Sequence, residues 1–139
     1  MTVAYSSVHG KAFGYGPAGV YVYGRLIGPG PSALGKGNTF YVDSAVGGSD
    51  GTSPLTALAT LDAAFAKCTA NQGDTIVVMP NHAETITGAG GITHDIAGVS
   101  VIGLGTYNQR PRFLMDAGTA VTYLISAADA YVSGLDFAS

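Results

Sequence analysis

The sequence contains a single cysteine, Cys68, and no tryptophan, and only 11 % of its 139 residues are charged. One cysteine excludes a disulfide within the chain, which is typical of proteins that fold in a reducing compartment. No stretch approaches the roughly 18 consecutive apolar residues that a membrane-spanning helix requires. The first residues, MTVAYSSVHGK, lack the apolar segment of a signal peptide. These absences predict a soluble protein that is made in the cytoplasm and inserts into no membrane.

Hydrophobic residues make up 47 % of the chain, enough for one domain with its own core. Residues 10–37 are different, because nine glycines and three prolines alternate there with aromatic and aliphatic residues. We therefore expect residues 1–38 to form an extended Gly/Tyr-rich N-terminal arm and residues 39–139 to form the body. Glycine lets a backbone follow the contours of a partner, and tyrosine supplies rigid contact area. The candidate partner-binding residues are Phe13, Tyr15, Tyr21, Tyr23, Arg25, Leu26 and Ile27.

Charge is divided unevenly along the chain. Residues 1–42 carry a net charge of +3, and residues 43–139 contain all nine acidic residues and carry −6. Three cations are too sparse for a nucleic-acid-binding tract, which needs clustered lysine and arginine. They suit docking onto an acidic protein surface. We therefore expect no direct contact with nucleic acid.

The body is expected to consist of short strands and one helix. A helix is predicted near 54–68, because Ser53 is a suitable N-cap and Pro54 suits the first helical position. Five apolar residues then recur at helical spacing, namely Leu55, Leu58, Leu61, Phe65 and Cys68. Strands are predicted at 38–44, 75–80, 84–87, 98–105, 112–116, 120–126 and 130–137. Short strands about ten residues apart predict an all-β fold with one short helix.

Two segments resemble the opening of right-handed parallel β-helix proteins. They are FYVDSAVGGSDGTSPLTALATLDAAFAKC, residues 40–68, and NQGDTIVVMPNHAETI, residues 71–86. DIAGVSVIGLG, residues 95–105, is similar to the rung that follows, so the resemblance covers residues 39–137. Three rungs, for which the chain has room, bury little core. The expected fold is therefore a jelly-roll-like β-sandwich, with a short right-handed parallel β-helix of about three rungs as the alternative.

In size, composition and architecture the chain also resembles the capsid decoration (cement) proteins of tailed bacteriophages. The resemblance implies a non-enzymatic virion protein that binds the outside of a phage capsid lattice and clamps neighbouring major capsid subunits. Its expected partners are the major capsid protein and further copies of itself, as a homodimer or trimer, with no cofactor and no small-molecule substrate. The alternative is a polysaccharide-binding or polysaccharide-cleaving β-helix fragment of a phage tailspike.

Residues of the types that support catalysis or metal binding show no spacing typical of a catalytic or metal site. The polysaccharide-cleaving alternative would draw on the polar residues His82, Glu84, His94, Asp95, Arg110, Arg112 and Asp116, none of which recurs at rung spacing. We expect each of them to be a hydrogen-bonded residue of a turn or strand end. Asp43 and Asp50 lack the alternating acidic spacing of a calcium loop, and His9, His82 and His94 lack zinc-ligand spacing. The sequence therefore predicts no catalytic residue and no metal site.

Overall fold

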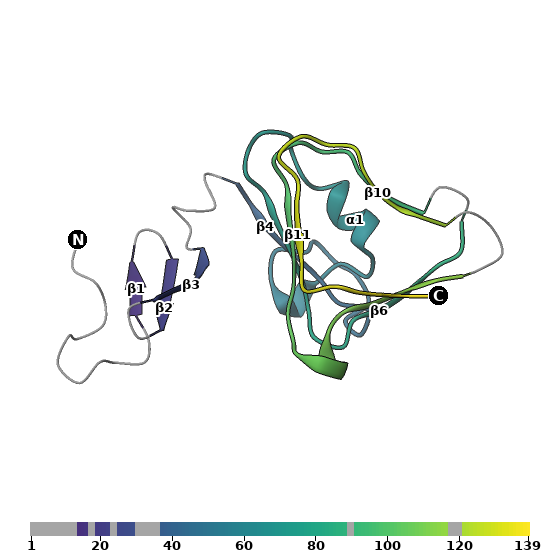
Figure 1. Ribbon diagram of the computed structural model, residues 1–139, viewed down its shortest axis with the longest axis horizontal. Coiled ribbons are helices and arrows are strands. Elements are labelled where there is room, and N and C mark those ends of the chain that lie inside the picture. The colour runs from purple at the N-terminus through teal and green to yellow at the C-terminus, as the bar shows by residue number, and fades with distance from the viewer. Residues whose placement is uncertain (1–13, 17–18, 23–24, 30–36, 89–90, 117–120) are drawn as a thin grey trace. The chain divides into compact units, whose positions relative to one another are not determined.

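The computed structural model describes residues 14–16, 19–22, 25–29, 37–88, 91–116 and 121–139 (Figure 1). The chain divides into two compact units, Met1–Gly37 and Asn38–Ser139. In the first unit, strands β1 (Gly14–Gly16), β2 (Gly19–Val22) and β3 (Arg25–Pro29) form an antiparallel sheet in that order. β2 covers most of the VYVY motif, residues 20–23, and pairs with β1 on one side and β3 on the other.

The second unit, which we call the body, is built from short strands that pair in parallel. The strands are β4 (Thr39–Val42), β5 (Thr75–Val78), β6 (Ala83–Ile86), β7 (Ile92–His94), β8 (Ser100–Gly103), β9 (Arg112–Met115), β10 (Tyr123–Ile125), β11 (Tyr131–Ser133) and β12 (Asp136–Ala138). They form three sheets with the orders β11-β8-β5-β4, β12-β9-β6 and β10-β7. All pairs among the described body strands are parallel.

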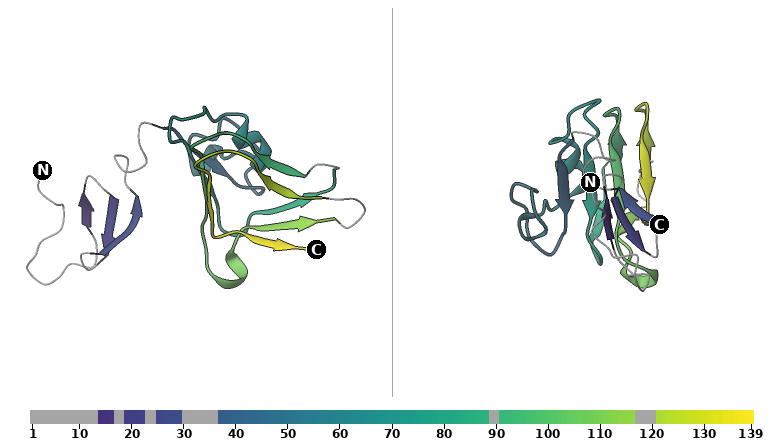
Figure 2. Two further views of the ribbon diagram at one scale, coloured as in Figure 1. Left: turned by 45° about the horizontal axis from the view of Figure 1, so that its top comes forward. Right: turned by 90° about the vertical axis from the view of Figure 1, so that its left-hand side faces the viewer.

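β4 pairs with β5 in one sheet, and from β5 onward successive strands lie in different sheets. Each strand from β5 to β9 pairs with the strand three positions later. β5, β6 and β7 make one turn of a coil, β8, β9 and β10 make the next, and β11 and β12 begin a third (Figure 2). The all-β class with one short helix is confirmed. The described body strands pair in parallel, whereas a jelly-roll sandwich is built from antiparallel pairs. Hydrophobic alternation is the same for both pairings, and only the tertiary fold distinguishes them.

The core of the body consists of inward-facing side chains stacked in columns. Ile76 of β5 lies in register with Val101 of β8, and both are fully buried. Val42, Val78, Ile92 and Phe113 are also fully buried and belong to the same cluster. Because each coil supplies only a few such residues, each layer depends on its neighbours for burial.

The predicted helix at 54–68 is wrong in its extent. The structure has a short 3-10 helix, η1 (Pro54–Thr56), and a short α-helix, α1 (Leu61–Phe65). Between them Leu58 forms a parallel bridge with Val42. Its N–H donates to Tyr41 O, and its carbonyl accepts from Asp43 N–H, both at 2.8 Å. This pairing with β4 is incompatible with a helix at Leu58. Among the described residues, no helix is long and apolar enough to cross a bilayer.

The apolar stripe on which the helix was predicted is only partly buried. Leu58, Leu61 and Phe65 are buried, but Leu55 is 88 % exposed. Ser53 is the N-cap of η1, whereas the N-cap of α1 is Thr60, whose Oγ1 accepts a hydrogen bond from Ala63 N–H at 3.2 Å. The spacing that predicted one helix is thus shared by residues in three different conformations.

The predicted strand at 130–137 is two strands, β11 and β12, separated by a turn at Gly134. Gly134 has φ +74°. A Cβ on Gly134 would clash with the carbonyl of Gly103 in the neighbouring coil. Glycine is required here both for the left-handed conformation and for the close approach. Strand β7 was not predicted, because its sequence, Ile-Thr-His, has a single apolar residue.

Asp74 explains the Gly-Asp-Thr-Ile motif at the start of the first coil. Its carboxylate is fully buried. Oδ1 accepts from the backbone N–H of Asn38, and Oδ2 accepts from the backbone N–H of Thr69, both at 2.6 Å. One carboxylate therefore joins the entry to β4, the segment that follows α1 and the first strand of the coil.

Candidate functional site

The predicted partner-binding residues lie in the N-terminal unit. Phe13 and Tyr23 fall outside the described residues. Of the rest, the backbone places Tyr21 of β2 opposite Leu26 of β3, and Val22 opposite Arg25. Tyr15 lies on β1, opposite Val20 of β2, and Ile27 lies on β3. The antiparallel sheet therefore brings these positions close together, although they are up to twelve residues apart in the sequence.

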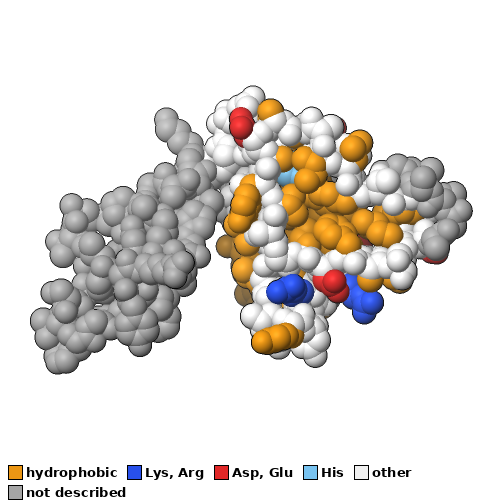
Figure 3. Space-filling model, viewed as in Figure 1, with side chains coloured by type: hydrophobic (Ala, Val, Ile, Leu, Met, Phe, Trp, Pro, Cys, Tyr) orange, Lys and Arg blue, Asp and Glu red, His pale blue; other side chains and the backbone are white. Residues whose placement is uncertain are grey.

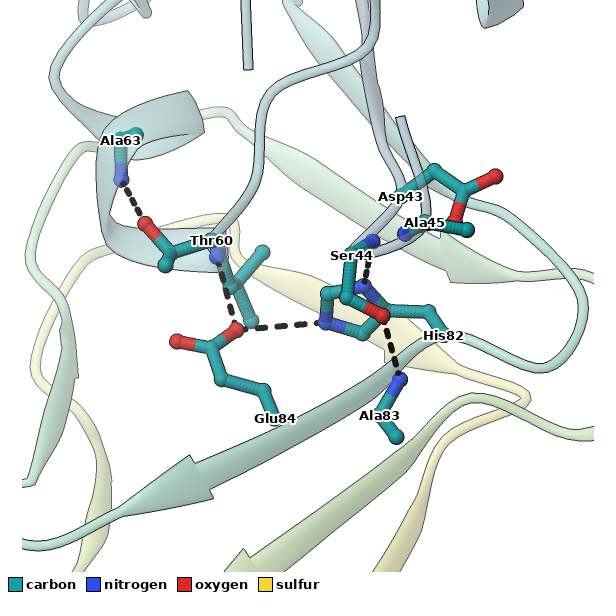
Figure 4. A network of polar contacts seen from close by, with 9 residues as sticks. Asp43, Ser44, Ala45, Thr60, Ala63, His82, Ala83 and Glu84 are labelled. Atoms are coloured by element: carbon teal, nitrogen blue, oxygen red, sulfur yellow. Dashed lines mark hydrogen bonds and ion pairs between the residues drawn. The ribbon is translucent and has the colours of Figure 1, made fainter. Parts of the chain in front are cut away.

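His82 and Glu84 form a polar network in the body (Figure 4). His82 Nε2 lies 3.2 Å from Glu84 Oε2. On the other side of the ring, the backbone N–H of Ser44 donates to His82 Nδ1 at 2.9 Å. The hydroxyl oxygen of Ser44 accepts from the N–H of Ala83 at 3.1 Å, and Glu84 Oε2 also accepts from the N–H of Leu61 at 3.0 Å.

These contacts determine the tautomer of His82. Because Nδ1 accepts from a backbone N–H, the ring proton resides on Nε2 and is donated to Glu84. His82 is fully buried and touches Phe113, with ring centroids 5.4 Å apart. Although serine, histidine and glutamate meet here, Ser44 offers Nδ1 its backbone N–H and not its hydroxyl. The arrangement lacks the nucleophile–base hydrogen bond of a catalytic triad.

The network joins three parts of the body. Leu61 is the first residue of α1, so its N–H has no acceptor within the helix. Glu84 of β6 supplies that acceptor, while His82 holds the loop after β4 through Ser44. Burial, followed by the negative charge of Glu84, raises the pKa of Asp62 in the first turn of α1. The chemistry of His82 and Glu84 is therefore that of a structural tie between loop, helix and strand.

His94 and Cys68 are also placed in or against the core. His94 is fully buried on β7. It packs against Phe65 with ring centroids 4.7 Å apart, and the Tyr123 hydroxyl lies 3.4 Å from its Nδ1. Burial lowers the pKa of His94. Burial, followed by the charge of Asp74, raises the pKa of the Cys68 thiol to about 12, and its Sγ donates to Ala64 O at 3.3 Å.

The remaining polar candidates lie at the surface. Asp95, Arg110 and Asp116 are exposed. Arg112 of β9 lies beside Asp136 of β12, with Nε 3.9 Å from Oδ2, and both side chains are more than half exposed. A shallow hollow of about 300 Å³ is lined by Ala83, Glu84, Thr85, Arg112 and Leu114.

Asp43 and Asp50, whose spacing does not fit a calcium loop, each stabilise a turn. Asp43 Oδ1 accepts from the N–H of Ala45 at 2.9 Å. Asp50 Oδ1 accepts from the N–H of Thr52 at 3.0 Å and from its hydroxyl at 2.9 Å. The backbone hydrogen bond from Thr52 is the largest cause of the lowered pKa of Asp50. Within the described ranges, no three His, Cys, Asp or Glu residues are grouped so as to hold a metal ion.

The last layer of the coil carries a cluster of exposed and half-buried apolar residues, which we call the open end. It consists of Tyr123, Leu124 and Ile125 of β10, Tyr131 and Val132 of β11, and Phe137 of β12. Leu124, Ile125, Tyr131 and Phe137 are between 44 % and 56 % exposed. Figure 3 shows hydrophobic side chains filling the area that the ribbon of the coil encloses in Figure 1.

The sequence analysis missed most of the open end, because its residues look like ordinary core positions of strands. The available signal was the period-2 spacing of Tyr123 and Ile125, which predicts an apolar face on this strand. In the described part of the body, nothing covers it. No protein-family model matches the chain, and no curated protein or solved structure is significantly similar to it.

Proposed function

We propose that this protein is a structural component of a bacteriophage virion that binds the outside of the capsid lattice and stabilises it, without catalysis. The observation that supports the proposal is that polar groups of the body are buried and hydrogen-bonded, whereas a cluster of apolar side chains is exposed. The buried polar groups His82, Glu84 and Asp74 hold the coil together through hydrogen bonds. Apolar side chains are instead exposed together at the open end. An exposed apolar cluster with unpaired strand edges is typical of a surface that binds protein.

The N-terminal unit is the part that we propose meets the major capsid protein. It is a compact unit separate from the body, and its sheet brings Tyr15, Tyr21 and Leu26 to neighbouring positions. Its positive charge, against the negative charge of the body, favours an acidic partner surface. Binding to the assembled lattice in preference to free subunits would stabilise the shell by mass action.

The test is attachment of the full-length protein to capsids of the phage that encodes it. The variant carries Tyr21→Ser and Leu26→Ser, two positions that face each other across β2 and β3. The matched control carries Tyr107→Ser and Leu55→Ser, which are 91 % and 88 % exposed on the body. We expect the first pair to reduce co-sedimentation with capsids at least tenfold and the control to bind as the parent does.

Equal binding by the two double variants would refute the role of the N-terminal unit. Absence of the parent protein from purified particles would refute the capsid assignment altogether.

The parallel coil favours a second candidate, a polysaccharide-binding tailspike fragment. The hollow lined by Glu84 and Arg112 lies over the β6-β9-β12 sheet, and polar side chains on such a sheet can hydrogen-bond sugar hydroxyls. Arg112→Ala would then abolish binding to the surface polysaccharide of the host, measured by calorimetry. Lack of binding by the parent would exclude this candidate.

A further inference from the structure

We propose that His94 makes the contact between β7 and β10 sensitive to pH, so that protonation of its imidazole releases β10 while the rest of the body stays folded. The inference concerns the body alone and does not depend on the capsid role. It follows from three properties of the described residues: the surroundings of the His94 ring, the charges near it, and how firmly the neighbouring elements are held.

The His94 ring is enclosed by two aromatic rings from different elements. Its side chain is fully buried. The ring of Phe65 in α1 packs against it, with centroids 4.7 Å apart. The ring of Tyr123 in β10 lies perpendicular to it, with centroids 6.5 Å apart. Water therefore reaches the imidazole only if α1 or β10 moves.

The neutral form of the imidazole suits this environment. Burial raises the pKa of Tyr123, so its hydroxyl keeps its proton and donates to His94 Nδ1 over 3.4 Å. The ring proton then resides on Nε2, which is buried and has no hydrogen-bond partner among the described residues. A second ring proton would turn Nδ1 into a donor and place a positive charge between two aromatic rings, away from water, which is unfavourable.

The charges around His94 do not compensate an imidazolium. Among the described residues, the acidic group whose charge acts on His94 is Asp95, and its side chain is exposed. On the side of α1, Asp62 interacts with Glu84, and the pKa of the Cys68 thiol is raised to about 12, so this thiol is neutral. Burial lowers the pKa of His94, and the charge of Asp95 opposes this only in part.

Helix α1 is held more firmly than β10. The N–H of Leu61 donates to Glu84 Oε2 at 3.0 Å, and both Leu61 and Phe65 are buried. β10 pairs with β7 over three residues. In the described part of the body these two strands form a sheet of two, whereas β5 and β8 belong to a sheet of four. Opening of β10 is therefore the smaller change that hydrates His94, and such local opening is typical of weakly held elements.

The backbone of His94 also connects it to the end of β10. Its carbonyl accepts from the N–H groups of Ser126 and Ala127, both at 3.1 Å, and its register partner on β10 is Ile125. A movement of His94 toward water would therefore break hydrogen bonds to the residues that follow β10.

The sign of the pH effect follows from the lowered pKa of His94. Below the ordinary histidine pKa of 6.5, the opened state binds more protons than the closed state, because its imidazole is hydrated. Acidification therefore favours opening. Between neutral pH and pH 5.0 the opening equilibrium shifts by at most about thirtyfold, the limit reached when the closed state binds no proton.

The experiment is residue-resolved hydrogen exchange of the full-length protein at pH 7.5 and 5.0, with rates corrected for the intrinsic effect of pH on exchange. Protection of the amides of β10, Ser126 and Ala127 should fall roughly tenfold at pH 5.0, and amides of β5 and β8 should keep theirs. In His94→Gln, which is polar but cannot be protonated, this fall should disappear. Asp95→Asn is the matched control, and its fall should be at least as large as that of the parent, because it removes the charge that favours the imidazolium.

Nuclear magnetic resonance titration of the His94 ring in the parent gives a second readout, which does not depend on the stability of a variant. Protonation of the ring should follow the same pH dependence as the loss of protection in β10. Unchanged protection of β10, or an equal loss in β5, β8 and β10, overturns the proposal. So does a folded His94→Gln variant that loses protection as the parent does, or a His94 ring that titrates at pH 6.5 or above.

Discussion

Replacing Asp74 by asparagine tests whether one buried carboxylate holds the start of the coil. In the parent its two oxygens accept from the N–H groups of Asn38 and Thr69, both at 2.6 Å. Asparagine keeps one acceptor, but its NH₂ group then faces the second N–H donor. A hydrogen bond to a charged group contributes about 1.5–3 kcal/mol, and an unsatisfied donor adds to the loss. We expect Asp74→Asn to lower the free energy of unfolding by about 2–4 kcal/mol.

The assay is thermal and urea unfolding followed by circular dichroism. For a domain of this size, a loss of that magnitude lowers Tm by roughly 10–25 °C. Asp116→Asn is the matched control, because it removes the same charge from an exposed side chain. It should change Tm by less than about 2 °C, as surface substitutions usually do. If Asp74→Asn melts together with Asp116→Asn, the two hydrogen bonds do not stabilise the fold and the reasoning is refuted.

Two further predictions concern α1 and His94. Leu61→Ala should lower the free energy of unfolding by about 2–5 kcal/mol, the usual range for a buried leucine. Leu55→Ala should leave it almost unchanged, because Leu55 is 88 % exposed. Equal losses of the two variants in urea unfolding would contradict the assignment of these helices. Burial lowers the pKa of His94 below its ordinary value of 6.5, against the opposing effects of Val99 and Asp95. Below about pH 6.5 the unfolded chain therefore binds more protons than the native one, so stability falls on acidification. The measurement is Tm at pH 7.5 and at pH 5.0. The decrease in Tm between these pH values should be smaller for His94→Gln than for the parent. An equal decrease in both proteins would show that His94 does not cause the loss of stability in acid.

The sequence predicted most of the strands and the turn residues that lie between them. β5, β8 and β9 lie within predicted segments, because each contains apolar residues of high β-propensity between turn residues. The resemblance to parallel β-helix proteins rested in part on the Gly-Asp-Thr-Ile motif, whose aspartate has a local structural role. These features depend on short-range chemistry, which is readable along the chain.

The site was predicted less well. His82 and Glu84 were singled out as polar residues at a strand end, and the structure gives each of them hydrogen-bond partners. Leu61 lies 23 residues from Glu84 and Ser44 lies 38 residues from His82, so neither partner could be identified beforehand. Segments 120–126 and 130–137 were predicted as strands, and only the coil brings β10, β11 and β12 into one layer. Whether the N-terminal residues bind a partner stays a prediction.

What the sequence by itself determined is the all-β class, the positions of most strands and the division of charge along the chain. What only the tertiary structure decided is the direction of strand pairing, the length of the helix and the location of the exposed apolar surface. Leu58 illustrates the physical reason. Its spacing from Leu61 and Phe65 suits a helix, but hydrogen bonds to Tyr41 and Asp43 hold it in extended pairing with β4. Local periodicity indicates which side chains will be buried, and only long-range contacts determine the residues that bury them.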